Sequence, residues 1–362
     1  MTQRERQVLQ AIGENPMISQ QDLADKLGLT RSAVAVHISN LMKKGHIAGK
    51  GYVLRTGSYA VVVGGCNMDI GGQSFTELVS EDSNPGTVRM SPGGVGRNIA
   101  NNLTLLGVDV RMLTALGDDL YGKQIAASCA EQGIDLSCAL RVPDKATSTY
   151  LYIADHRGDM ALAVSDMRVC DEITPAYLEK HQGLLSNAQV IVADTNIPAE
   201  SLEYLANCCA VPLFCDPVST KKAEKLRPIL SKIHTLKPNL LEAELLSGVK
   251  IEKEADIEKA ADRLFEMGVH RLFISLGAKG VYAATKEKRL RIPNLPVNPL
   301  NTTGCGDSFM AALAWAYLEG TDLEESAVAG LAAAGITMES PHAINPAMSA
   351  DSLRARMADR MK

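Results

Sequence analysis

The stretch Asn301-Thr302-Thr303-Gly304-Cys305-Gly306-Asp307 decides how the rest of this chain is interpreted. The apolar helical pattern of residues 308–318 follows it directly, so we expect Asp307 at the N-terminus of a helix. A glycine turn at a helix start leaves backbone N–H groups free, and together with the positive end of the helix dipole they bind anions. Taken alone, a carboxylate in this position would be interpreted as a helix cap.

A second glycine-rich segment, Pro92-Gly93-Gly94-Val95-Gly96-Arg97-Asn98-Ile99-Ala100, lies about two hundred residues upstream. It also opens a helical pattern, in which Ile99, Leu103 and Leu106 recur before Gly107. Glycines let a ligand approach the backbone, and the amide of Asn98 can both donate to and accept from hydroxyl groups. By itself the segment indicates only a tight turn, because its spacing is not that of the dinucleotide-binding fingerprint.

Together, in this order and at this separation, the two segments resemble the paired signatures of the ribokinase-like (PfkB) carbohydrate and nucleoside kinases. The resemblance covers about residues 58–350 and is sharpest toward the pseudouridine kinase branch, which residues 82–86, 190–194, 216–219 and 234–239 also resemble. Two positions depart from the second signature: Asn301 replaces the usual Asp, and Cys305 stands where Ala, Gly or Ser is usual. We interpret Cys305 as a small buried residue whose N–H can still face an anion.

The resemblance implies a catalytic site and a sugar site. Asp307 would accept the proton of a primary hydroxyl group, while the N–H groups of Gly304, Cys305 and Gly306 would stabilise charge on the transferred phosphoryl group. The residues implied for the sugar are Asn67, Asp69, Gly93, Gly94 and Asn98. Without the resemblance, Asp69 could be an ordinary turn carboxylate.

The resemblance also implies ATP as the phosphoryl donor and Mg²⁺ as its metal. In Lys237-Pro238-Asn239-Leu240-Leu241-Glu242, the family pattern N-x-x-E uses Asn239 and Glu242 to hold Mg²⁺ through water, which suits a cation that dehydrates reluctantly. Without the resemblance, Glu242 would be a solvated helix charge. The residues implied for ATP are Asn239, Ser275, Gly277, Gly280 and Thr303. A monovalent cation such as K⁺ is left open as a further cofactor.

Composition limits the remaining possibilities. The chain has 362 residues, 46% of them hydrophobic, which is enough for more than one compact unit. It has no apolar run long enough for a membrane span and no signal-peptide pattern, so we expect a cytoplasmic protein without a membrane partner. Eight cysteines without a C-x-x-C pair and seven histidines without ligand spacing indicate reduced thiols and no zinc site.

Residues 1–56 differ from the rest in charge and pattern. They carry eight Lys or Arg against four Asp or Glu, a net charge of +4 in a chain whose total is −5. Three short helical patterns, the second beginning near Ser19 and the third after Thr30, precede a basic ribbon at residues 46–55. This arrangement resembles a winged helix-turn-helix. The residues expected to contact duplex DNA are Arg31, Ser32, His37, Lys43, Lys44 and Lys50. The alternative is a trihelical unit that only mediates dimer or domain contacts.

The body alternates strand and helix patterns, which predicts an α/β fold with a mainly parallel sheet and helices on both faces. The strands are expected at residues 60–63, 190–193, 211–214 and 272–275, and the helices at residues 121–132, 200–207, 223–232 and 257–267. Residues 75–90, 148–153 and 160–164 break this rhythm and look like hairpin strands outside the main sheet. The resemblance implies that they form a small β-lid over the sugar that also makes a homodimer contact.

The sequence thus predicts a winged-helix domain at residues 1–56 and a ribokinase-like domain at residues 57–362, with lid segments at about residues 70–92 and 146–166. The activity implied is transfer of the γ-phosphoryl group of ATP to the 5′-hydroxyl of a nucleoside, first of all pseudouridine, with autoregulation through DNA. Two alternatives stay open: a kinase for another nucleoside or a ribose-like sugar, and a ligand-sensing transcriptional regulator built on a kinase fold.

Overall fold

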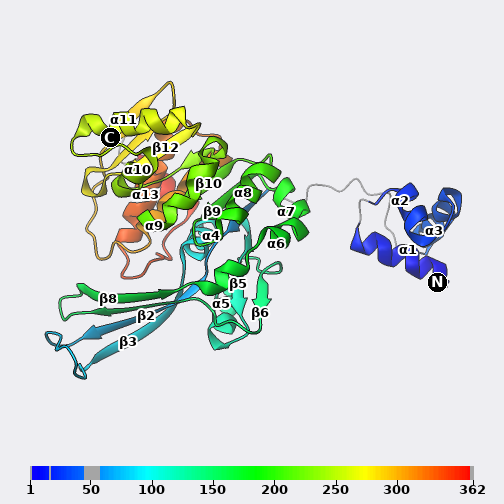
Figure 1. Ribbon diagram of the computed structural model, residues 1–362, viewed down its shortest axis with the longest axis horizontal. Coiled ribbons are helices and arrows are strands. Elements are labelled where there is room, and N and C mark those ends of the chain that lie inside the picture. The colour runs from blue at the N-terminus through cyan, green and yellow to red at the C-terminus, as the bar shows by residue number, and fades with distance from the viewer. Residues whose placement is uncertain (1, 16–17, 45–57, 359–362) are drawn as a thin grey trace. The chain divides into compact units, whose positions relative to one another are not determined.

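The computed structural model describes residues 2–15, 18–44 and 58–358 (Figure 1). The chain divides into two compact units, Met1–Gly57 and Ser58–Lys362. The basic ribbon expected at residues 46–55 lies outside the described residues. Within the described ranges, no helix combines the length and the apolar character that crossing a membrane requires.

The first unit contains three helices: α1 (Gln3–Glu14), α2 (Gln20–Leu27) and α3 (Arg31–Lys43). Each begins after a hydroxyl residue, Thr2, Ser19 or Thr30, whose side-chain oxygen accepts a hydrogen bond from the backbone N–H three residues later. Such caps satisfy N–H groups that the first helical turn leaves unpaired. The apolar faces meet in a small core made by Val8, Ala11, Leu23, Ala24, Val34 and Leu41.

The second unit is built on an eight-stranded sheet in the order β14-β13-β12-β11-β10-β9-β1-β4. The six strands from β12 to β4 run parallel, whereas at one edge β13 is antiparallel to β12 and β14 is antiparallel to β13. In the order of the sheet the strands are β14 (Arg289–Ile292), β13 (Val281–Ala284), β12 (Arg271–Ser275), β11 (Thr235–Leu236), β10 (Leu213–Asp216), β9 (Val190–Asp194), β1 (Tyr59–Val63) and β4 (Asp109–Leu113).

Side chains of the central strands alternate between two hydrophobic cores, one on each face of the sheet. Ala60 and Val62 of β1 point into one core, whereas Val61 and Val63 point into the other. Both faces are buried, which is why these strands read as continuous apolar runs in the sequence. The predicted α/β fold with helices on both faces is therefore confirmed.

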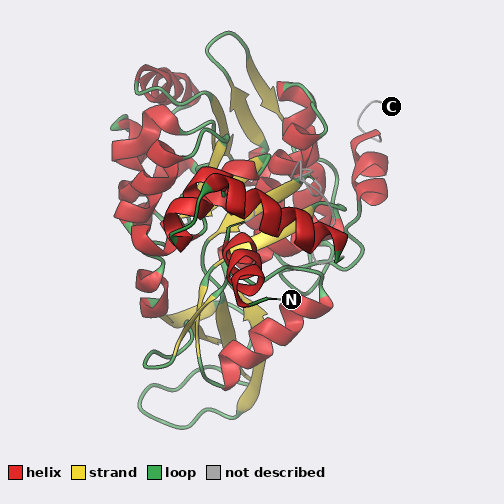
Figure 2. Ribbon diagram, turned by 90° about the vertical axis from the view of Figure 1, so that its right-hand side faces the viewer, coloured by secondary structure: helices red, strands yellow, loops and turns green. Residues whose placement is uncertain are grey.

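Helices cover both faces of the sheet (Figure 2). Those that contribute to the core of Ala60 and Val62 are α4 (Val95–Leu105), α5 (Leu120–Glu131), α12 (Cys305–Leu318), α13 (Leu323–Met338) and α14 (Ala350–Ala358). Those that contribute to the core of Val61 and Val63 are α6 (Pro175–Lys180), α7 (Gln182–Asn187), α8 (Ala199–Cys208), α9 (Thr220–Ala223), α10 (Leu240–Ser247) and α11 (Glu254–Glu266), with the 3₁₀ helices η1 (Arg168–Glu172) and η2 (Glu224–Lys232). A third 3₁₀ helix, η3 (Gly277–Lys279), joins β12 to β13.

A separate four-stranded sheet extends from this body as an arm (Figure 1). We call it the lid; its order is β3-β2-β7-β8, with β2 (Asn67–Ser74), β3 (Gly86–Gly93), β7 (Thr149–Ala154) and β8 (Met160–Asp166). The remaining strands, β5 (Ala115–Gly117) and β6 (Leu140–Val142), pair with each other. The expectation of lid strands within residues 75–90 was partly wrong, because residues 75–85 form the loop that joins β2 to β3. The side chain of Asn84 holds that loop closed through hydrogen bonds with both backbone groups of Val79.

Prolines explain two further differences from the sequence prediction. The strand expected at residues 211–214 begins two residues later, after Pro212, which has no N–H to give a sheet and instead accepts a hydrogen bond from Ile191. The helix expected at residues 223–232 is mostly the 3₁₀ helix η2, which contains Pro228. Proline in a helix removes a hydrogen bond and clashes with the preceding turn, so a regular α-helix is disfavoured there.

Candidate active site

Gly304 sets the start of α12. It has a φ of 81°, and a Cβ at this position would lie 2.2 Å from the carbonyl oxygen of Ala343, so a side chain is excluded on both counts. The first bond along the helix runs from the N–H of Ser308 to the carbonyl of Gly304 at 2.9 Å. The N–H of Cys305 makes a long bond of 3.4 Å to the carbonyl of Thr302. The glycine turn therefore presents helix-terminal N–H groups beside Asp307.

Asp307 is joined to the other glycine-rich segment by a hydrogen bond. The amide of Asn98 donates to Asp307 at 2.8 Å, which connects α4 and α12 across 209 residues of sequence. Arg97 orients this amide, because its guanidinium donates at 3.3 Å to the side-chain oxygen of Asn98 and at 3.0 Å to the carbonyl of Pro92. The sequence did not single out Arg97, which is buried and whose side chain acts through its neighbour.

The surroundings of Asp307 favour its protonated form. Burial and the nearby carboxylates of Asp216 and Asp194 raise the pKa of this carboxyl group, Asn98 and Lys237 partly offset the shift, and the resulting pKa is about 8. The residue nevertheless keeps some solvent exposure, so a substrate could reach it. A carboxyl group that titrates near neutral pH can act as a general base.

An ion pair that the sequence did not reveal lies beside this turn. The ammonium of Lys237, at the end of β11, is 3.1 Å from the carboxylate of Asp216, at the end of β10, and both side chains are buried. Burial opposes the charged form of Lys237, but the carboxylates of Asp216, Glu242 and Asp307 outweigh it and hold the pKa of Lys237 above its ordinary value. A Cβ on Gly306 would lie 3.4 Å from this ammonium, so Lys237 is next to the glycine turn.

Asp194, at the end of β9, fixes two glycine segments in place. Its carboxylate accepts hydrogen bonds from the N–H of Gly65 at 3.0 Å and of Asn196 at 2.8 Å. A Cβ on Gly64 or Gly96 would fall 2.4 Å or 3.0 Å from the same carboxylate oxygen. Asp194 therefore holds the turn that leads into β2 against the start of α4. The sequence could have indicated Asp194, because it ends a strand pattern and ligands of open α/β sheets bind at the carboxyl ends of the strands.

The residues expected around the sugar gather where β2, β3 and α4 meet. Asn67 and Asp69 lie on β2 itself, and the amide of Asn67 donates to Asp69 at 2.5 Å. Gly93 leaves room for this pair, since a Cβ there would fall 2.0 Å from the carboxylate of Asp69. Gly94 has a φ of 101° and lies against the carbonyl of Gly65. Burial raises the pKa of Asp69, although Asn67 and Arg97 act in the opposite direction.

Asn239 and Glu242 form a reciprocal cap at the start of α10. The side chain of Asn239 accepts from the N–H of Glu242, and the carboxylate of Glu242 accepts from the N–H of Asn239, both at 2.9 Å. Burial raises the pKa of the Glu242 carboxyl group. The cap therefore uses one oxygen of each side chain, and Glu242 is a buried carboxylate rather than a solvated one.

The remaining residues expected around ATP lie in two loops. The N–H of Ser275 donates to the carbonyl of Pro238 at 2.9 Å, which brings the turn between β12 and β13 next to the start of α10. Gly277 and Gly280 in that turn have φ values of 58° and 94°, and a Cβ on Gly280 would fall 2.0 Å from the carbonyl of Ile292. Thr303 lies in the other loop, where its N–H donates to the side chain of Asn301 at 2.9 Å.

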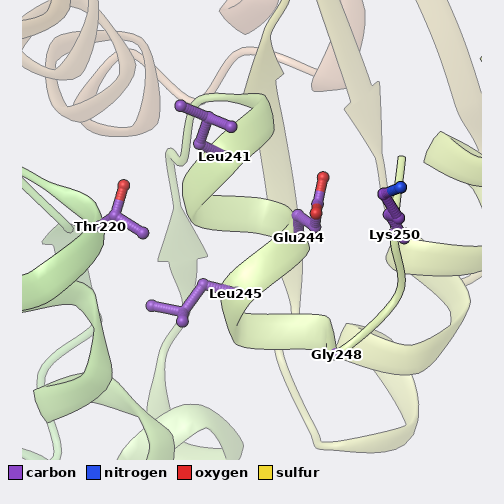
Figure 3. Close-up of a pocket in the computed structure, with 6 residues that line it drawn as sticks. All are labelled: Thr220, Leu241, Glu244, Leu245, Gly248 and Lys250. Carbon is purple, nitrogen blue, oxygen red and sulfur yellow. The ribbon is translucent and has the colours of Figure 1, made fainter. Parts of the chain in front are cut away.

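The pocket drawn in Figure 3 is a different feature. It has a volume of about 490 Å³ and is lined by Thr220, Leu241, Glu244, Leu245, Gly248 and Lys250 along α9 and α10. None of the residues predicted for catalysis, for the sugar or for ATP lines it. The site around Asp307 is instead defined by the polar side chains that surround this carboxyl group, which are those of Asn98, Lys237, Asp216 and Asp194.

In the first unit, the residues expected to contact DNA have different surroundings. Arg31 and Ser32 are exposed in the first turn of α3, whereas His37 is half-buried. The ammonium of Lys44 is 2.7 Å from the carboxylate of Glu5, so this cation is paired within the unit. The side chain of Lys43 and the whole of Lys50 lie outside the described part of the chain.

Comparison with known families identifies the second unit. The pfkB family carbohydrate kinase profile matches residues 58–350. The chain belongs to the pfkB family of carbohydrate kinases. A winged helix-turn-helix DNA-binding profile matches residues 1–47. The expected family, fold and reaction class are thereby confirmed: the protein is a ribokinase-like sugar or nucleoside kinase, a phosphotransferase with an alcohol group as acceptor. Among solved structures of the same fold, a ribokinase of Arabidopsis thaliana is complexed with ribose and ATP, and a ribokinase II of E. coli is in complex with ATP and Mg²⁺.

Individual relatives show how far the similarity extends. The uncharacterized sugar kinase YeiI of Escherichia coli K12 is 41% identical over 353 residues, covering 97% of this chain and 98% of that protein. The pseudouridine kinase of the same organism is 40% identical over 299 residues, covering 82% of this chain and 95% of that protein. Among solved structures, the ribokinase of Thermotoga maritima has 25% identity and a TM-score of 0.75, covering 83% of this chain and all of that one.

The burial of Asp307 leads to a prediction about stability. Between its ordinary pKa of 3.8 and the folded value of about 8, the folded protein holds a proton that the unfolded chain has released. Stability from this proton is therefore complete at low pH and is lost as the pH rises through about 8. Asp307→Asn, which cannot become charged, should raise the thermal midpoint relative to the wild-type protein increasingly from pH 5 to pH 8.5.

The measurement is a series of thermal unfolding curves across that pH range. Asp118→Asn, which removes an exposed carboxylate at the start of the turn before α5, is the matched control and should show no such trend. A difference between Asp307→Asn and wild type that does not grow with pH would show that Asp307 titrates normally.

Proposed function

We propose that this chain is an ATP-dependent nucleoside kinase that phosphorylates the 5′-hydroxyl of pseudouridine. The observation that carries this proposal is the half-buried Asp307, bonded to Asn98 and flanked by the Lys237–Asp216 pair at a helix-terminal glycine turn. The 40% identity with the E. coli pseudouridine kinase, over 95% of that protein, supports the substrate. YeiI is uncharacterized, so its higher identity favours no particular sugar or nucleoside.

In the proposed mechanism Asp307 acts as the general base. As the hydroxyl oxygen bonds to the γ-phosphorus of ATP, the bond from this phosphorus to the β–γ bridging oxygen breaks and ADP leaves, while the proton of the hydroxyl moves to the carboxylate of Asp307. The N–H groups of Gly304, Cys305 and Gly306 would stabilise charge on the phosphoryl group, with the Cys305 group first giving up its long bond to Thr302. The ammonium of Lys237 beside Gly306 would add a positive charge at the same place. Asp69 and Asn67 would hold the ribose hydroxyls so that the 5′-oxygen lies at Asp307.

The residues at the start of α10 fit a water-mediated Mg²⁺ ion. Among the described residues, no three His, Cys, Asp or Glu side chains come together in a way that could hold a metal ion directly. Mg²⁺ usually keeps several waters and takes one or two carboxylates plus substrate phosphates, so one buried Glu242 with Asn239 is a suitable donor set. When bound with ATP, the ion would neutralise phosphate charge.

Replacing the proposed base tests the mechanism. Asp307→Asn should lower kcat by about 10²–10⁴ while leaving nucleoside binding nearly unchanged, because the side chain meets the substrate only at the reacting hydroxyl. Steady-state kinetics and a separate nucleoside-binding titration measure the two effects. A variant that keeps more than about a tenth of wild-type kcat, a far smaller loss than removal of a base causes, would show that another group takes the proton.

Competition between substrates tests the nucleoside. Pseudouridine should have a higher kcat/KM than uridine, because its C-glycosidic base offers one more ring N–H, and a site that pairs with such a donor discriminates strongly. Equal kcat/KM for the two nucleosides, or a preference for free ribose, would leave a kinase of another specificity. Ligand binding without turnover of any nucleoside or sugar would favour the regulator instead.

We also propose that the lid forms a homodimer contact. Val88, Leu151, Leu162 and Val164 share one face of the lid and are 72%, 42%, 64% and 57% exposed, which leaves a contiguous apolar surface. Leu162→Glu should therefore halve the mass measured by light scattering after size exclusion. Ala163→Glu, which introduces the same carboxylate on the opposite face of β8, should leave the mass unchanged. A monomeric wild-type protein would refute the proposal.

For the first unit we propose binding to duplex DNA, supported by the winged helix-turn-helix match and by the exposed Arg31 and Ser32 at the start of α3. The DNA affinity should fall steeply as the salt concentration rises. Arg31→Ala should reduce the slope of the logarithm of the binding constant against the logarithm of the salt concentration by about one, without altering kcat. Arg4→Ala, on α1, is the matched control. Deleting residues 1–56 should abolish binding and preserve turnover.

The experiment uses the full-length protein and its own upstream DNA in a fluorescence anisotropy titration, with and without nucleoside. Salt-independent or absent binding would remove the DNA-binding function from this unit. Autoregulation additionally requires the nucleoside to shift the DNA affinity, because a ligand that binds two states equally shifts neither.

A further inference from the structure

The lid face that carries Asp69 also carries two tyrosines. In the register of β2 with β7, Asp69 is paired with Tyr150 and Gly71 with Tyr152. Paired residues on neighbouring strands project from the same face, and positions two apart along a strand are about 7 Å apart. Tyr150 therefore projects beside the sugar residue Asp69, and Tyr152 lies one step further along the arm.

This is the face turned toward the sugar site. On this face, Asn67 donates a hydrogen bond to Asp69, and the absence of a side chain at Gly93 leaves room for the Asp69 carboxylate. The exposed apolar side chains Val88 and Leu162 are in register with Gly72 and Ile153, and so belong to the opposite face. The two faces of the lid thus differ in chemistry: one is aliphatic, and the other combines a carboxylate with aromatic rings.

The two rings form a continuous surface because of a glycine. The Tyr150 and Tyr152 ring centroids are 6.0 Å apart with a tilt of 36°. A Cβ on Gly71 would fall 2.4 Å from Cζ and Oη of Tyr152, so the ring lies directly across this glycine. Both tyrosines are only half-buried, which leaves ring surface open to a ligand. The hydroxyl of Tyr150 donates a hydrogen bond to the sulfur of Met160, on β8, at 3.5 Å.

We propose that Tyr150 and Tyr152, lying over Gly71, form the stacking surface for the base of the nucleoside whose ribose is held by Asp69. This inference rests on the proposed nucleoside kinase function. A base attached to a ribose on Asp69 extends from the sugar by about the length of one such step along the strand, and planar rings prefer offset or tilted contact with aromatic side chains. Stacking accepts any base, so this surface selects nucleosides over free sugars and leaves the choice among bases to hydrogen bonds.

The test compares nucleoside and ribose in three variants. Tyr152→Leu keeps apolar bulk but removes the flat ring, and should raise the KM for pseudouridine and uridine by about tenfold with little change in kcat. Tyr152→Phe keeps the ring and should remain near wild type. Gly71→Ala should also raise the nucleoside KM, because its methyl group displaces the Tyr152 ring. Ribose, measured as substrate or as competitive inhibitor, should be affected by none of the three, and this also shows that the lid remains folded.

The outcomes separate this inference from the function on which it rests. If the wild-type protein phosphorylates nucleosides but Tyr152→Leu changes nucleoside and ribose constants alike, or changes neither, the stacking surface is refuted and the kinase stands. If Tyr152→Phe loses as much nucleoside affinity as Tyr152→Leu, the hydroxyl rather than the ring makes the contact, which also refutes it. A wild-type protein that binds ribose but no nucleoside overturns both proposals.

Discussion

The constraint on which the site depends is the burial of several charges in one place. A carboxylate surrounded by protein is costly unless it is protonated, hydrogen-bonded or paired. Here Asp307 has Asn98 as its donor, Asp216 has Lys237 at 3.1 Å, and Asp194 has two backbone N–H groups. Each partner comes from a different element, so the sheet, α4 and α12 must all be in place before these carboxylates are accommodated.

Parallel topology is what brings these groups together. Asp194 and Asp216 end the neighbouring strands β9 and β10, and Lys237 follows β11. In a parallel sheet the carboxyl ends of neighbouring strands lie along one edge, which is where ligands of open α/β sheets bind. The glycines complete the arrangement by letting backbone segments approach the carboxylates: Gly64 and Gly96 face Asp194, and Gly93 faces Asp69. Side chains at these positions would displace the carboxylates of Asp194 and Asp69.

Side chains alternate between the two faces of the lid as they do in the main sheet, but the faces of the lid are not both buried. On β1 successive side chains enter two buried cores, whereas on β7 Leu151 is exposed on one face and Tyr150 and Tyr152 lie half-buried on the other. Because a strand changes face at every residue, one short sheet presents a carboxylate with aromatic rings on one face and apolar side chains on the other. A shift of one residue in register would exchange the two.

The sequence by itself determined the α/β class, the family and the start of α12, because local patterns encode them: buried parallel strands are continuous apolar runs, and glycine turns open helices. It was less accurate where proline acted, at β10 and η2, and where Asn84 closes the lid loop. Only the tertiary structure decided that Lys237 pairs with Asp216, that Arg97 orients Asn98, and that Tyr150 stands beside Asp69. Lys237 and Asp216, like Tyr150 and Asp69, are far apart in the chain, and their contacts depend on strand order and register, which no local pattern specifies. Arg97 and Asn98 are neighbours in the chain, but the direction of their side chains depends on how α4 packs.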